Sequence, residues 1–306
     1  MGRRIRWTLA GAGLTAAALT AGLLVALGGR STTPVAASVA PPMDTAISPA
    51  PPTSTSEVPY PDLSAVAGDV SDAVTAASRG TNVGFVLYDR RSGKVLASLE
   101  ADQPYYTASV VKLLIAIDEV HDDTTGTWAL PDADAVQDLT DMLAGSNDGI
   151  ASALWEQNGG NTIVTRTAAL IGLSNTTPPT DPTQWGMAKM SAADVVAVYS
   201  YLEDSVPDEV ASPLLAALGD ARNPADDGWD QYFGIPDGLP GMSWQIKQGW
   251  MILRYALVLN TTGVVGGRYV VVLLTQQPLV SSAKGRAAVT AGVKTLGPLL
   301  TQLNAT

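Results

Sequence analysis

The sequence predicts an α+β fold built on one antiparallel sheet of about five strands, with helices covering both faces. Segments with the character of strands lie near the two ends of the folded part, at 82–102, where apolar residues alternate, and at 243–277. A block with helical spacing, 109–220, lies between them, and further helices come first and last. Because strands and helices are segregated, an alternating βαβ arrangement is not expected. Sites then fall in a groove between the helical lobe and the sheet.

The first helix and hairpin are the clearest of these elements. Residues 62–79 have apolar side chains at helical spacing, with Asp62 as a candidate N-cap. In 82–102, Val83, Phe85 and Leu87 alternate toward one face, and the stretch RRSGK turns the chain back. A terminal helix and a two-stranded hairpin are therefore expected at the start of the domain.

The rest of the chain divides in the same way. Helices are expected at 109–119, 136–145, 148–160, 191–204, 207–220 and 281–303. Loops are expected at 121–135 and at the proline-rich stretch 175–186. Three further strands are expected at 243–250, 252–263 and 268–277.

Composition excludes several kinds of site. The chain of 306 residues has no cysteine and one histidine, His121. Disulfides, thiol catalysis and a zinc site built on several histidines are thereby excluded, and we expect no metal and no organic cofactor. A hydrolase of this composition would draw its base from lysine or a carboxylate. The net charge of -11 argues against nucleic-acid binding.

The N-terminus has the pattern of a targeting segment. Three arginines in MGRRIRW precede an uncharged run from Trp7 to Gly28. As a helix this run measures about 33 Å, close to the roughly 30 Å of a hydrocarbon core. We expect residues 1–30 to be a signal-anchor that places one span in the cell membrane and the domain outside the cytoplasm. Small residues in VAASVA leave cleavage, and hence secretion, open.

A linker and one domain follow. Residues 31–62 are rich in Pro, Ser, Thr and Ala, a composition that cannot bury a core and favours an extended tether. The folded domain is expected to span 63–306, a size at which a full core is easily buried.

A serine and a lysine in TASVVK form the first candidate pair. Ser109 and Lys112 are spaced i, i+3, which places them on one helix face. Ser109 at a helix N-terminus would lie near free backbone N–H groups that stabilise an oxyanion. Lys112 lies among apolar residues, and burial favours its neutral form, which a base requires. The alternative is a lysine at the wet edge of a core helix.

Two further motifs change the balance between these interpretations. The stretch GSNDGIASAL places Ser146, Asn147 and Asp148 at the start of a helix, and WQIKQGW places Lys247, Gln248 and Gly249 on a strand. The order of a hairpin, S-x-x-K, an S-D-N-like helix start and a K-T-G-like strand resembles the penicillin-recognising serine hydrolases. These include the class A β-lactamases and the penicillin-binding D,D-peptidases. The resemblance implies a β-lactamase/transpeptidase-like fold with a reduced helical lobe.

The resemblance also implies a role for each matching residue. Ser109 would be the acylated nucleophile, Lys112 its base, and Ser146 a proton shuttle to the leaving nitrogen. Lys247 would attract the substrate carboxylate and keep Lys112 neutral. Substrate binding would involve Asp148, Gln248, Gly249 and Trp250, and the backbone N–H groups of Ser109 and Trp250 would form the oxyanion hole.

The sequence departs from the family at three points. Asp148 stands where the family usually has asparagine, which would favour the charged form of Lys112. Gln248 replaces a hydroxyl residue. Between Gln157 and Leu202 there is no glutamate to serve in deacylation, and Asp181 is the only acid within the proline-rich loop. An acid in such a loop is usually a turn former.

Three functions remain open at this point. The first is a membrane-tethered serine hydrolase that forms a Ser109 acyl-enzyme with a peptidoglycan peptide or a β-lactam. The second is a β-lactamase with true turnover. The third is a catalytically weakened module on the same fold that binds cell-wall peptides.

Overall fold

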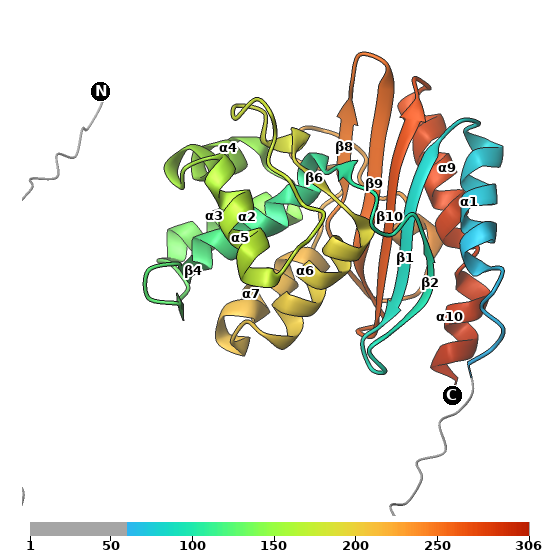
Figure 1. Cartoon of the computed structure of the whole chain (residues 1–306), viewed down its shortest axis with the longest axis horizontal. Coiled ribbons are helices and arrows are strands. Elements are labelled where there is room, and N and C mark those ends of the chain that lie inside the picture. Colours follow the sequence, from blue (N-terminus) through green and yellow to red (C-terminus); the bar gives the residue numbers. More distant parts are fainter. Residues whose placement is uncertain (1–59, 306) are drawn as a thin grey trace, which may run out of the picture. The chain divides into compact units, whose positions relative to one another are not determined.

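The protein is represented by a computed structural model that describes residues 60–305 (Figure 1). Its main sheet is antiparallel, with strand order β2-β1-β10-β9-β7, and β8 also pairs with β9. The strands are β1 Asn82–Asp89, β2 Lys94–Leu99, β7 Trp244–Ile246, β8 Gly249–Ile252, β9 Ala256–Val265 and β10 Tyr269–Pro278. Because β7 and β8 share one neighbour, the sheet is five positions wide, as predicted.

Both faces of the sheet are buried, each against its own layer of helices. The predicted face of β1, with Phe85 and Leu87, packs on α1 Val66–Ala77, α9 Ser282–Lys294 and α10 Gly297–Asn304. Val86 points the other way and joins the core of the helical lobe. Figure 1 shows the two layers on opposite sides of the strands. This arrangement explains why nearly every residue of β9 and β10 is buried, on both faces of the sheet.

The helical lobe is formed by the middle of the chain. Its longer helices are α2 Lys112–Val120, α3 Ala133–Ala144, α4 Asp148–Gln157, α5 Asn161–Ile171, α6 Ala192–Asp204 and α7 Asp208–Gly219. Outside the lobe, the short helix α8 Ile235–Gly238 packs with α9 on the other face of the sheet. Within the lobe, short helical turns are η1 Ala108–Val111 and η2 Trp185–Met187. Two small strand pairs complete it: β3 Tyr105–Tyr106 with β6 Lys189–Met190, and β4 His121–Asp122 with β5 Thr127–Trp128.

The α+β class and the antiparallel sheet are confirmed, and several element boundaries are corrected. Asp62 does not cap α1; its carboxylate accepts from Ser64 N in a turn before the helix. The segment 243–250 is two strands interrupted at 247–248, and 281–303 is two helices. The loop 121–135 contains the β4–β5 pair and the first residues of α3, and α5 was not predicted.

The N-terminal predictions concern residues that the structure does not describe. The signal-anchor at 1–30 lies wholly outside the described residues, as does the linker at 31–62 except for its last three positions. Among residues 60–305, no helix is long and apolar enough to cross a membrane.

A buried carboxylate joins the first described residue to the sheet. Asp89, at the end of β1, is fully buried and forms two hydrogen bonds with Arg268, of 2.9 and 2.8 Å. Tyr60 Oη donates to the same carboxylate at 2.6 Å, and Ser92 Oγ donates at 3.1 Å. Burial alone would raise the pKa of Asp89, but these donors outweigh it and hold that pKa well below its usual range.

Candidate active site

Ser109 lies on a strained turn between β3 and α2. The preceding residue, Ala108, has φ of 45°, a left-handed conformation that non-glycine residues adopt at a cost. Ser109 is 5% exposed and belongs to the 3₁₀ turn η1 that runs directly into α2. Thr107 fixes the start of this turn, because its N–H and its hydroxyl both donate to the carbonyl of Ala188, at 2.9 and 3.0 Å.

The main sheet supports the same turn from the other side. Asn260, buried in β9, donates from Nδ2 to the carbonyls of Tyr106 and Thr107 at 2.8 and 3.1 Å. Gly249 of β8 pairs with Asn260. A Cβ atom on Gly249 would lie 2.5 Å from the carbonyl oxygen of Thr107. Glycine is therefore required here so that β8 can approach the serine-bearing turn, whatever contact it makes with substrate.

Two buried lysines meet at Ser146. Lys112 is fully buried, and its Nζ lies 2.6 Å from the carbonyl oxygen and 3.2 Å from Oγ of Ser146. Lys247 is 1% exposed, and its Nζ lies 2.8 Å from the same Oγ. The hydroxyl of Ser146 thus bridges the two lysine nitrogens, and three of the four predicted catalytic side chains form one hydrogen-bonded chain.

The backbone around Ser146 has the shape that this bridge requires. Ser146 has φ of 55°, which turns its carbonyl and hydroxyl toward the lysines. Asn147 is the N-cap of α4, and its carboxamide oxygen accepts from Ile150 N at 3.0 Å. Asp148 is the first residue of that helix. The order Ser-Asn-Asp therefore uses asparagine for the helix cap and directs the acid toward the site.

Asp148 pairs with Lys112. Its Oδ1 lies 2.6 Å from Lys112 Nζ, and its side chain is 61% exposed. Burial lowers the pKa of Lys112, and Asp148 opposes that shift. Burial and the charge of Lys112 together lower the pKa of Lys247 well below its usual range. Among residues 60–305, Lys247 has no carboxylate within ion-pair distance, so the protonated state is favoured at Lys112 over Lys247.

Ser109 is close to this chain of groups but is not bonded to it. Within the described part of the chain, no hydrogen bond joins Ser109 Oγ to Lys112, whose Nζ is engaged by Ser146 and Asp148. Ser109 and Asp148 do line one cavity of about 290 Å³, together with Ser152, Trp185 and Trp250. Lys112 Nζ also lies 4.9 Å from the ring centre of Trp185.

Trp250 forms an ordered wall of this cavity. Its ring stacks on Trp229 with centres 5.9 Å apart and planes 4° from parallel, and its Nε1 donates to Asp227 at 2.9 Å. Arg286 covers the far side of the aromatic pair, 5.5 Å from the Trp229 ring centre. Trp250 therefore keeps one fixed orientation beside Ser109.

The backbone N–H of Trp250 is oriented for an incoming oxygen. In antiparallel pairing, alternate residues of a strand bond to the neighbouring strand. The N–H groups of Lys247 and Leu253 donate to the β9 carbonyls of Thr262 and Ala256, at 3.0 and 2.8 Å. Trp250 is three residues from each of them, an odd number, so its N–H group points away from β9, toward the free edge of the sheet. Because β8 packs on η1, this N–H group lies in the strand next to the serine turn.

Gln248 has a different placement from the one predicted for a substrate contact. Its side chain is fully buried, and its Nε2 donates to the carbonyls of Gln231 and Phe233. The amide holds the 231–233 segment against β8 and does not line the cavity of Ser109. Asp181 is also placed away from the nucleophile: its Oδ1 accepts from the N–H and hydroxyl of Thr183, as expected of a turn former.

Sequence reasoning missed the residues that support the site from a distance. Asn260, Trp229, Asp227 and Gln231 were not predicted, although each bonds to or packs against a site element. No local motif marks them, because their partners lie up to 154 residues away in the chain. The described residues contain no cluster of three or more potential metal ligands.

The fold resembles that of solved serine β-lactamases. A class A β-lactamase from Bacteroides cellulosilyticus superposes with a TM-score of 0.64 at 12% identity, covering 78% of this chain and 99% of that one. A β-lactamase from Streptomyces albus G gives 0.58 at 20% identity, over 77% and 99%. A structure described as PBP-A gives 0.59 at 15% identity, over 80% and 98%. At these identities the likeness establishes the fold, which confirms the predicted resemblance at that level.

Curated relatives are closer in sequence. LppW of Mycobacterium tuberculosis, named as a candidate lipoprotein, is 36% identical over 229 residues, which cover 73% of this chain and 72% of LppW. The same match is found in Mycobacterium bovis. No family model matches the sequence.

Proposed function

Since the chain belongs to the LppW family and has the fold of class A β-lactamases, we propose that it is a serine hydrolase that opens amide bonds through an acyl-enzyme on Ser109. Its substrates would be cell-wall peptides or β-lactams. The observation that carries this proposal is the convergence of three separate motifs. Ser109, Asp148 and Trp250 line one cavity, and Asp148 bonds to Lys112, which heads the buried Lys112–Ser146–Lys247 chain.

In the proposed acylation, Ser109 Oγ attacks the carbonyl carbon and transfers its proton to neutral Lys112. The oxyanion that forms accepts hydrogen bonds from the N–H groups of Ser109 and Trp250. When the C–N bond breaks, the proton passes from Lys112 through the hydroxyl of Ser146 to the leaving nitrogen. The short contacts of Ser146 with both lysines support this relay.

Lys112 must lose a proton before this sequence can begin. Asp148 stabilises the protonated form, whereas burial and the neighbouring Lys247 disfavour it. The balance between Asp148 and Lys247 thus sets the fraction of enzyme ready to react, and we expect acylation to be slower at low pH.

Release of the acyl group should be slow. Among the described residues that line the cavity of Ser109, Asp148 is the only acid, and it is already paired with Lys112. No second carboxylate is placed to activate water. The proposed enzyme therefore acylates and retains the product, which is the behaviour of a penicillin-binding protein rather than of a β-lactamase with turnover.

We place this activity outside the cytoplasm and at the membrane. The lipoprotein name of LppW supports an exported, membrane-associated family. This chain has no cysteine to carry a lipid, so its own anchor would be the apolar segment at 1–30, followed by the linker 31–62 and the domain 63–306.

A second candidate is a cell-wall binding module without catalysis. The Lys112–Asp148 ion pair favours it, since a lysine held as a cation is no base. Binding would then use the cavity that Asp148, Trp185 and Trp250 line, and loss of the Ser109 hydroxyl would not change it.

Intact mass spectrometry after incubation with a fluorescent penicillin decides between these functions. The proposal predicts a stable mass increase of one drug molecule that is absent in Ser109→Ala. Ser152→Ala is the matched control, because Ser152 lines the same cavity and should leave the adduct unchanged. Decay of the adduct with accumulating hydrolysed drug would indicate β-lactamase turnover. Absence of any adduct, with peptide binding intact in Ser109→Ala, would establish the binding module.

A further inference from the structure

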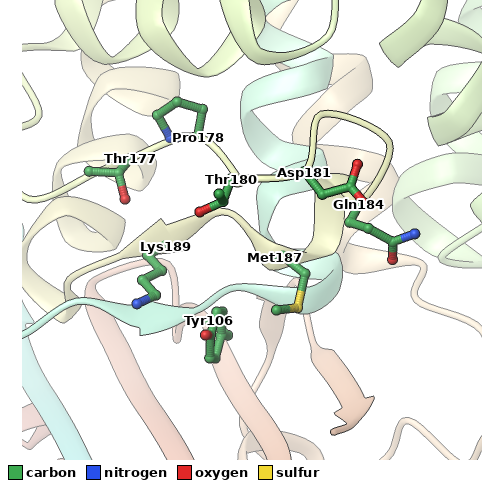
Figure 2. A pocket seen from close by; sticks show the side chains of 8 residues that line it. All are labelled: Tyr106, Thr177, Pro178, Thr180, Asp181, Gln184, Met187 and Lys189. Atoms are coloured by element: carbon green, nitrogen blue, oxygen red, sulfur yellow. The ribbon is translucent and has the colours of Figure 1, made fainter.

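A second cavity lies on the other side of the loop that borders the Ser109 cavity. It encloses about 440 Å³ between residues 177–187 and the β3–β6 pair (Figure 2). Eight residues line it: Tyr106, Thr177, Pro178, Thr180, Asp181, Gln184, Met187 and Lys189. We call it the Lys189 pocket. Its volume falls within the range of about 300–1,000 Å³ that is typical of small-molecule sites.

Lys189 gives the pocket a cation without an ionic partner. Its Nζ lies over the ring of Tyr106, 4.7 Å from the ring centre. Throughout residues 60–305, no carboxylate lies within ion-pair distance of Lys189, although the whole chain carries a net charge of -11. Asp181 lines the same pocket, but its Oδ1 is occupied by Thr183. Figure 2 shows Asp181 and Lys189 at opposite ends of the pocket.

Hydroxyl groups and apolar surface complement this charge. Figure 2 shows Thr177 and Thr180 on one side of Lys189, with the Tyr106 ring and the Met187 side chain on the other. In the part of the chain that the structure describes, neither threonine hydroxyl has a hydrogen-bond partner within the protein. The two hydroxyls and the lysine in one pocket provide donors that suit the two oxygens of a carboxylate. The ring and the thioether suit a short apolar group next to it.

We propose that the Lys189 pocket binds a small carboxylate ligand, such as an acylated amino acid, independently of the Ser109 cavity. The ammonium group pairs with the carboxylate, and Thr177 and Thr180 donate to its oxygens. The attached apolar group packs on Tyr106 and Met187.

The pocket is joined to the nucleophile through short stretches of chain. Tyr106 precedes Thr107, and Lys189 follows Ala188; these two neighbours are the residues whose hydrogen bonds fix the Ser109 turn. Gln184 lines both cavities. A bound ligand would therefore stabilise the strand pair on which that turn is built, without contacting Ser109.

Ligand-observed NMR on the full chain in a neutral detergent tests the proposal. The probe is N-acetylglycine, and its neutral amide is the control ligand. We expect N-acetylglycine to bind and the amide to bind at least about tenfold more weakly. Lys189→Met should weaken N-acetylglycine at least tenfold, about 1.4 kcal/mol, while Lys189→Arg should retain binding and Thr180→Val should weaken it. Lys284→Met, at an exposed lysine of α9, and Ser109→Ala should bind as the parent does.

Several results would overturn the proposal. Equal affinity for the acid and the amide would show that the carboxylate is not recognised. Unchanged affinity in a folded Lys189→Met variant would show that the ligand binds elsewhere. An equal loss of affinity in Lys284→Met would show that the protein's net charge, and not the position of Lys189, determines binding. Because Ser109→Ala retains the pocket, a failed acylation assay does not affect this test, and a failed binding test does not affect the acylation assay.

Discussion

Replacing Asp148 with asparagine should make the candidate enzyme faster at low pH. The change removes the anion that lies 2.6 Å from Lys112 Nζ while it keeps an oxygen able to accept its hydrogen bond. The Asp148 side chain is 61% exposed, so we use the dielectric constant of water, which gives about 1.6 kcal/mol at that 2.6 Å distance. Losing this attraction lowers the pKa of Lys112, because only the protonated form was stabilised. At pH values where Lys112 is mostly protonated, its neutral fraction should rise about fifteenfold.

The rate of acylation by a penicillin, followed by intact mass across a range of pH, measures this effect. In Asp148→Asn the acid limb of the profile should move to lower pH, with up to about fifteenfold faster acylation on that limb and little change at its alkaline plateau. Asp181→Asn is the control, because Asp181 bonds to Thr183 and contacts neither site lysine. A folded Asp148→Asn variant with an unmoved acid limb would refute Lys112 as the base.

Three further substitutions test how the site and the sheet are supported. Gly249→Ala should lower the free energy of unfolding by about 1–3 kcal/mol and slow acylation, because the new Cβ would clash with the Thr107 carbonyl oxygen. Urea denaturation measures the first effect, and intact mass after incubation with a penicillin measures the second. Asn260→Leu removes the side-chain hydrogen bond to the Tyr106 carbonyl and one of two bonds to the Thr107 carbonyl, which still accepts from Val110 N. It should destabilise the protein by about 1–3 kcal/mol in the urea assay, and an unchanged midpoint would contradict the bonding described. Arg268→Met should cost about 3–5 kcal/mol by leaving Asp89 buried and unpaired. Because the pKa of Asp89 is lowered on folding, the stability that its carboxylate contributes is present above about pH 4 and is lost as the pH falls further. Acid should therefore lower the free energy of unfolding of the parent more than that of Arg268→Met.

The strands of the first hairpin could be predicted because a local pattern specifies them, whereas the helix expected from residue 109 begins at Lys112 after the turn η1. The alternation of Val83, Phe85 and Leu87 follows from the pleat of a strand, and one face of β1 does pack on the terminal helices. Helix α5 gave no such signal. Its β-branched residues, such as Ile163 and Val164, disfavour a helix locally, and complete burial of both side chains in the lobe decides the outcome instead.

The site could be predicted only as far as its motifs. The resemblance of the three motifs to those of the penicillin-recognising serine hydrolases allowed Lys112, Ser146 and Lys247 to be grouped, and the structure brings them within hydrogen-bond distance. The sequence could not predict which way the Gln248 side chain points. Its amide donates to backbone carbonyls, and because every residue has a carbonyl, no residue type marks these acceptors. The break in the strand beside it has the same origin: Lys247 turns inward to Ser146, a contact between residues 101 positions apart.

The bond between Tyr60 and Asp89 also has a mechanical consequence. Tension on the chain before residue 60 would enter the folded part along the backbone toward α1 and also through the Tyr60 phenol. The second path leads to β1, Arg268 and the start of β10. This path runs along the strands at the far side of the sheet from α2 and α4 (Figure 1). The serine turn and the two lysines lie off the path. A protein held by its N-terminus could therefore be pulled and released at that end while the geometry around Ser109 stays undisturbed.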